Sequence, residues 1–81
     1  MVAYKRIHRQ DGRAIYEYYP EGDTSAPGMV WVSEDGTEWG LISMPEGSFS
    51  AYYVHAVLDI QRAAKQGVLR ECGEVEWYGE E

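Results

Sequence analysis

Cysteine, proline and long apolar runs are scarce or absent in this sequence. Its single cysteine, Cys72, rules out an internal disulfide. No run approaches the roughly 18 apolar residues of a membrane-spanning helix, and the first residues lack the apolar core of a signal peptide. Together these absences predict a cytoplasmic protein in a reducing compartment, without a membrane as its partner.

Lysine and arginine are missing from residues 14–61, although acidic residues occur throughout that stretch. All seven basic residues lie outside it, and the formal net charge of the chain is −7. Binding of nucleic acid requires a basic footprint on the protein, so this composition argues against nucleic acid as a direct partner. It is compatible with a basic protein partner, which the acidic segment would steer. It is equally typical of small proteins whose charge serves only solubility.

Motifs that carry catalysis are also missing. The sequence contains no glycine-rich phosphate loop, no G-x-S-x-G nucleophile elbow and no calcium loop. His55 and Asp59 have the i,i+4 spacing of a carboxylate that orients a general base, but a solvent-exposed pair has the same spacing. Cys72, His8 and His55 are too few for a structural zinc site. We therefore predict no catalytic residues, no metal site, no cofactor and no enzymatic activity.

The length of 81 residues predicts a single domain, residues 1–81, in which residues 79–81 and the loop 21–25 are expected to be mobile. A chain this short buries only about 60% of the surface that its unfolded form exposes, so its core has no room for a large ligand cavity. Aromatic residues make up 14% of the sequence, and such large side chains let a small core bury much area. Any binding site should therefore be a shallow groove or a surface patch.

Two Asp-Gly dipeptides predict two β-hairpins. Asp-Gly supplies the positive φ angles of a two-residue type I′ turn, and both dipeptides lie between runs rich in aromatic and β-branched residues. A two-residue turn at Asp11-Gly12 places Tyr4 opposite Tyr19 and Arg6 opposite Glu17. Arg6 and Glu17 are therefore expected to form a cross-strand ion pair.

The same rule at Asp35-Gly36 gives the second hairpin two apolar faces. Trp31 is expected opposite Gly40, where its ring can cover bare backbone. The two faces are Val30, Val32, Trp39 and Leu41 on one side, and Met29, Trp31, Gly40 and Ile42 on the other. A sheet with two apolar faces must be covered twice or leave one face exposed.

Helical periodicity follows the second hairpin. It predicts a helix over residues 50–66, with Ser48 or Ser50 as the N-cap and Gly67 at the left-handed C′ position. The predicted core-facing arc comprises Tyr53, Ala56, Val57, Ile60, Ala63 and Ala64, and the opposite polar arc comprises His55, Asp59, Arg62 and Gln66.

The last periodic segment, residues 68–78, predicts a final strand with a bulge or break at Gly73. The chain is therefore predicted to be an α+β domain, a small antiparallel sheet packed on one helix in the order β-β-β-β-α-β. One helix can cover one face of such a sheet but not both. The other face must keep some aromatic surface exposed or be covered by a second copy of the chain.

Aromatic and acidic residues supply the candidate binding positions, because tyrosine and tryptophan are favoured interface anchors and a tight turn presents acidic side chains outward. The candidates are Trp31, Tyr52 and Trp77, with Trp39 as a further aromatic to test, and Glu34, Asp35 and Glu38 in the second turn. They favour a small acidic non-catalytic protein-interaction domain that binds or inhibits a basic partner, for instance by presenting carboxylates in place of phosphates. Two alternatives stay open: a small-ligand-binding domain with an aromatic groove, and a homodimerisation module.

Overall fold

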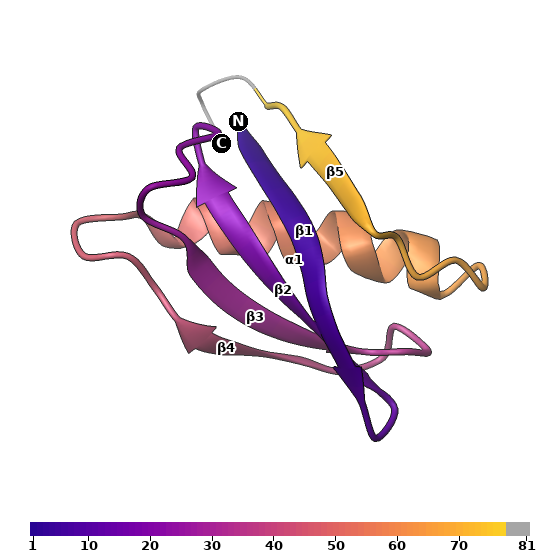
Figure 1. The fold of residues 1–81 in the computed structure, drawn as a ribbon. Helices are drawn as coiled ribbons and strands as arrows, with labels where there is room; N and C mark the ends of the chain where they lie inside the picture. The colour runs from indigo at the N-terminus through magenta and orange to yellow at the C-terminus, as the bar shows by residue number, and fades with distance from the viewer. Residues whose placement is uncertain (78–81) are drawn as a thin grey trace.

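The computed structural model describes residues 1–77 as one sheet and one helix (Figure 1). Its elements, in chain order, are strands β1 (Val2–Gln10), β2 (Arg13–Pro20), β3 (Gly28–Ser33) and β4 (Trp39–Ser43), helix α1 (Ser50–Ala64) and strand β5 (Cys72–Val75). The strand order is β4-β3-β2-β1-β5, and every neighbouring pair is antiparallel. The predicted α+β class and element order are therefore confirmed, while the expected mobility of residues 79–81 concerns a segment outside the described residues.

Helix α1 lies across one face of the sheet (Figure 1). It packs mainly on β1, β2, β3 and β5, so that β4 extends beyond it. We call the sheet face opposite the helix the open face, because no other element of residues 1–77 covers it. The two edge strands are β4 and β5. Within residues 68–77, β5 has four residues, so it is shorter than the strand that periodicity predicted over residues 68–78, whose last residue lies outside the described part of the chain.

The first hairpin has the predicted turn but not the predicted register. Asp11 and Gly12 adopt φ angles of 56° and 79°, as a type I′ turn requires, and the pairs next to the turn are those expected. A β-bulge between Arg6 and His8 then shifts the pairing by one residue. The Asp-Gly signal therefore located the turn correctly, and the bulge shifted the pairing of the β1 residues from Val2 to Arg6 by one position.

The bulge gives Tyr4 and Arg6 new partners. Tyr4 lies opposite Tyr18, and its ring is thereby turned to the helix-facing side, where it is buried. Burial of this large aromatic side chain is the physical reason for the shifted register. The predicted Arg6–Glu17 ion pair is wrong, because the two residues are no longer opposite each other. Arg6 Nη1 instead donates to the Leu69 carbonyl at 2.8 Å.

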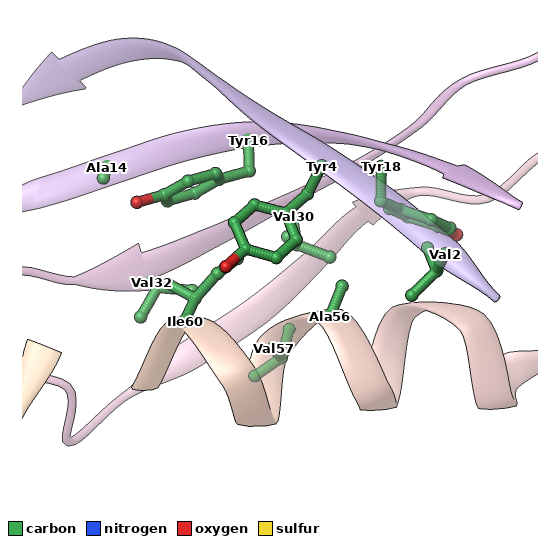
Figure 2. Close-up of a cluster of buried hydrophobic side chains, with 10 residues drawn as sticks. All are labelled: Val2, Tyr4, Ala14, Tyr16, Tyr18, Val30, Val32, Ala56, Val57 and Ile60. Atoms are coloured by element: carbon green, nitrogen blue, oxygen red, sulfur yellow. The ribbon is translucent and has the colours of Figure 1, made fainter. Parts of the chain in front are cut away.

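The core between the sheet and the helix is built around three tyrosine rings (Figure 2). Tyr4, Tyr16 and Tyr18 project from β1 and β2 and are at most 1% exposed. The rings of Tyr4 and Tyr16 meet edge to face with centroids 5.7 Å apart, a favourable aromatic geometry. The cluster is completed by Val2, Ala14, Val30, Val32, Ala56, Val57 and Ile60. Of the predicted core-facing arc of the helix, Ala56, Val57, Ile60 and Ala64 are buried, while Tyr53 and Ala63 are partly buried.

The three core tyrosine hydroxyls differ in their partners, which gives a graded prediction. Tyr4 Oη donates to the Asp59 carboxylate and Tyr16 Oη to the Arg70 carbonyl, whereas the buried Tyr18 Oη has no hydrogen-bond partner in residues 1–77. We expect phenylalanine to destabilise the fold by about 2 kcal/mol at Tyr4 and about 1 kcal/mol at Tyr16, because an acceptor loses its donor. At Tyr18 it should be neutral or stabilising, because burying an unbonded hydroxyl is costly. Urea unfolding of the three variants checks this order, and a loss at Tyr18 as large as at Tyr4 would contradict it.

Three glycines in the strands each lie directly across from an aromatic residue. The pairs are Tyr18 with Gly28, Tyr4 with Gly73, and Trp31 with Gly40. A Cβ atom at Gly28 would lie 2.2 Å from the Tyr18 ring, and one at Gly40 would lie 2.3 Å from Trp31 Nε1. Each ring therefore lies against bare backbone. The predicted pairing of Trp31 with Gly40 is confirmed. The bulge or break predicted at Gly73 is wrong, because Gly73 pairs in regular register inside β5, where it makes room for a ring.

Helix α1 begins without the predicted serine cap. Phe49 occupies the N-cap position and makes no capping side-chain hydrogen bond, and in residues 1–77 the buried Ser48 Oγ has no partner either. At the other end Gly67, with a φ of 88°, takes the left-handed position as predicted. The Val68 amide donates to the Ala63 carbonyl at 3.0 Å, which completes a Schellman motif. The C-terminus of the helix is thus well closed, while its N-terminus is not.

Candidate functional site

Strand β4 forms one edge of the sheet, so the backbone groups along its outer side have no strand partner within residues 1–77. The strand is apolar on both faces: Trp39 is 39% exposed, Leu41 41% and Ile42 46%. No charged residue occurs from Trp39 to Pro45. We call residues 39–44 the β4 edge. An exposed, apolar edge strand of this kind is a template for pairing with another chain.

The opposite edge, β5, is protected against such pairing. It is only four residues long, and Glu71, Glu74 and Glu76 place carboxylates beside and within it. Short edge strands and charged side chains are the usual means by which proteins block edge-to-edge association. The two edges of one sheet therefore differ in chemistry, and of the two it is β4 that lacks this protection.

Apolar side chains of α1 extend the β4 edge on the helix side. Gln61 Nε2 donates to the Gly36 carbonyl at 3.0 Å, so this flank of the helix faces the β3–β4 connection. Val54 and Leu58 lie two turns and one turn before Gln61 on the same flank, and they are 37% and 50% exposed. Beside Trp39 on β4, these side chains leave a broad apolar surface uncovered.

On the open face, the β4 edge borders a hollow of about 560 Å³. We call this the open-face hollow, and it is lined by Gln10, Asp11, Arg13, Ile15, Trp31 and Ile42. The guanidinium carbon of Arg13 lies 4.0 Å from the centroid of the Trp31 ring, a cation–π contact. The hollow therefore combines apolar walls with one arginine and one tryptophan.

The three aromatic residues predicted as anchors lie in two separate places. Trp31 lines the open-face hollow. Tyr52 and Trp77 instead pack against each other with ring centroids 5.7 Å apart. His55 stacks on Trp77, with centroids 4.0 Å apart and an interplanar angle of 12°. These contacts fasten the segment after β5 to α1, so both rings are engaged in packing within the molecule.

The three acidic residues predicted as binding positions differ in how far their charge is engaged. Glu34 Oε2 accepts hydrogen bonds from Arg9 Nε and Nη2 at 3.1 and 3.0 Å. Asp35 accepts hydrogen bonds from the side chain and the amide of Thr37, and these bonds lower the pKa of Asp35. In residues 1–77 the Glu38 carboxylate has no hydrogen bond or ion pair, and it stands immediately before the β4 edge. Glu38 therefore keeps the most available charge of the three.

The helix arc predicted to be polar and solvent-exposed is partly engaged in the fold. Asp59 accepts the hydroxyl hydrogen of Tyr4 and lies 3.6 Å from Arg62 Nη1 and 3.8 Å from Arg70 Nη1. Burial raises the pKa of Tyr4, and its bond to Asp59 raises that pKa further, so the proton stays on the tyrosine. A carboxylate held in this way is not set to orient His55 as a base. Within residues 1–77, no three metal-ligating side chains form a cluster.

The binding residues predicted from the sequence do not include Leu41, Ile42, Val54 or Leu58. Their importance depends on β4 being an edge, which follows from the strand order and not from local pattern. One signal was present: a charge-free segment from residue 39 to residue 45 directly follows an acidic turn. Charge-free edge strands are rare in isolated domains because they invite association.

No family model, curated protein or solved structure matches this chain. In the described part of the chain, the helix is too short and too polar to cross a membrane. Function is therefore inferred from the geometry of the β4 edge and of the surfaces beside it.

Proposed function

We propose that this protein is a small non-catalytic protein-interaction domain that binds an extended segment of a partner protein along the β4 edge. The observation that carries the proposal is the contrast between the two sheet edges. Carboxylates flank β5, whereas β4 is uncharged and has exposed apolar side chains on both faces. Addition of a strand to such an edge gives affinity through main-chain hydrogen bonds and specificity through contacts of alternate side chains.

The surfaces beside β4 define what the added strand would contact. Its side chains would fall alternately on the two faces of the extended sheet. On the helix side they would meet Trp39, Leu41, Val54 and Leu58, and on the open face they would meet Ile42, all of which are partly exposed. The partner segment therefore needs apolar side chains in both directions over about five residues, the usual length of a strand.

Charge at both ends of the β4 edge favours a basic partner. Glu38 precedes the edge and Glu46 follows it, and both are exposed. Lysine or arginine residues that flank the apolar part of a partner segment would be attracted to these two carboxylates and to the net charge of −7. A second copy paired antiparallel at β4 would bring Glu38 of one copy toward Glu46 of the other, so like charges oppose a homodimer.

Strand addition predicts which backbone amide of β4 contacts the partner. The Ser33 amide donates to the Glu38 carbonyl at 2.8 Å. Antiparallel alternation then points the Gly40 amide toward β3 and the Leu41 amide outward. Leu41→Pro removes that outward donor without removing a β3–β4 hydrogen bond. Leu41→Ala is the matched control, because it truncates the same side chain and keeps the donor.

The test uses a synthetic peptide of alternating valine and threonine residues between lysine pairs, titrated into isotope-labelled protein. We expect amide shifts concentrated on β4, and about fivefold weaker binding to Leu41→Pro than to Leu41→Ala, because one backbone hydrogen bond contributes about 1 kcal/mol. A peptide flanked by glutamates should bind more weakly. Equal binding to the two variants would exclude strand addition. Shifts confined to the open-face hollow would favour the small-ligand alternative, and a dimer in sedimentation without peptide would favour self-association.

A further inference from the structure

The open-face hollow contains an arginine whose charge the fold leaves uncompensated. Arg6, Arg9, Arg62 and Arg70 each have a carboxylate oxygen within 4.0 Å. In the described residues 1–77, Arg13 alone among the arginines has no such partner, and its recorded contact is with the Trp31 ring. A guanidinium held against an indole keeps its hydrogen-bond donors directed outward in the plane of the group. Arg13 therefore presents, beside the Trp31 ring, a positive charge that no carboxylate of the described residues pairs with.

The Trp31 ring, against which Arg13 lies, packs on neighbouring residues. Trp31 lies opposite Gly40, and because a Cβ there would come within 2.3 Å of Trp31 Nε1, the ring rests on bare backbone. Ile15 pairs with Trp31 across β2 and β3, so its side chain stands beside the ring on the same face. Ile42 forms a further apolar wall of the hollow. The ring that contacts the guanidinium thus lies against Gly40 and beside Ile15.

We infer that the open-face hollow binds a small organic carboxylate with an aromatic body. The planar fork of Arg13 matches the two oxygens of a carboxylate, and Trp31, Ile15 and Ile42 offer apolar contacts to the rest of the ligand. A single negative charge fits better than a phosphate dianion, because Asp11 stands at the rim and the whole chain carries −7. The volume of about 560 Å³ lies within the usual range for a small-molecule site. This site is separate from strand addition at the β4 edge and goes beyond it.

The probe is 2-naphthoate, with the neutral isostere 2-naphthamide as its matched control. Titration into isotope-labelled protein should give saturable shifts at the side-chain N–H groups of Arg13 and Trp31 and at the Gly40 amide, with a millimolar Kd typical of a fragment. We expect 2-naphthamide to bind about tenfold more weakly, because the charge-assisted pair with Arg13 is lost.

Three variants separate the arginine from general charge effects. Arg13→Gln should weaken 2-naphthoate binding about tenfold, and Arg13→Lys should weaken it severalfold, because the charge remains but the planar fork is lost. Arg62→Gln, at an exposed position on α1, should leave the affinity unchanged. Equal affinity for naphthoate and naphthamide, or an equal loss in Arg62→Gln, would overturn the inference, as would shifts located away from the hollow. Peptide binding at Leu41 should survive Arg13→Gln, so the two sites can fail independently.

Discussion

Replacing Gly28 with alanine is expected to remove more than half of the free energy of unfolding of the protein. The new Cβ would lie 2.2 Å from the Tyr18 ring, which is 0% exposed and so has no solvent to move into. The neighbouring Tyr53 ring, 6.2 Å away, limits movement on the helix side. Overpacking of this severity costs about 3 kcal/mol or more, against a total stability on the order of 5 kcal/mol for so small a domain.

The same substitution at Gly40 is the control for Gly28→Ala. Gly40 also lies opposite an aromatic ring, but Trp31 is on the open face and is only partly buried, so a new Cβ at residue 40 can displace the ring from its place on the backbone toward solvent. We expect Gly40→Ala to cost about 1 kcal/mol, mainly through the lost packing of the ring. Urea denaturation followed by circular dichroism compares the two variants. Equal losses in the free energy of unfolding would show that the helix-facing core accommodates an added methyl group as well as the open face does.

Raising the pH above 10 is expected to unfold the protein cooperatively. Burial raises the pKa of Tyr18 to about 12, with a further contribution from the nearby Tyr53. Burial is also the main cause that raises the pKa values of Tyr4 and Tyr16. In the unfolded chain the same side chains ionise near pH 10. Above that pH the unfolded state holds fewer protons than the native state, so the free energy of unfolding falls as the pH rises through the native pKa values.

The size of this alkaline effect follows from the number of buried tyrosines. Tyr4 and Tyr18 each cost about 1.4 kcal/mol per pH unit above 10, so the two together remove about 3 kcal/mol one unit higher, and Tyr16 acts in the same direction. Below pH 10 this contribution to stability is fully present. Ionisation of the buried tyrosines, followed by absorbance at 295 nm, should therefore coincide with the loss of the far-ultraviolet dichroism signal. Titration of all tyrosines near pH 10 with the dichroism intact would contradict the packing described for the core.

The parts of the fold that the sequence predicted correctly are those decided by local chemistry. Asp11-Gly12 has few alternatives to a tight turn, and Gly67 suits the left-handed end of a helix. The predicted register of β1 was wrong because the observed register depends on burying Tyr4 against a helix that lies far away in the sequence. The prediction of a serine N-cap was wrong because the path of the chain from β4 places Phe49 at the N-cap position.

The candidate site was harder to predict than the fold, because it depends on which strand lies at the edge. An uncharged β4 is unremarkable in the middle of a sheet and significant only at its border. Tyr52 and Trp77 are of the residue types favoured as interface anchors. The return of the chain after β5 instead packs their rings against each other within the molecule. Of the predicted binding positions, Trp31 and Glu38 lie next to the β4 edge, and they are the two whose roles remain open to a partner.

The pairing of β5 with β1 also bears on the order in which the chain folds. The other strand pairs join neighbours along the chain, whereas Val2 pairs with Val75 across almost the whole described length. Closing so long a loop costs entropy that only late, cooperative contacts repay. The meander of β1 to β4 should therefore assemble first, with β5 docking near the end of folding. That late step places Gly73 against the Tyr4 ring. The docking of β5 is therefore expected to set the rate at which the native core is completed.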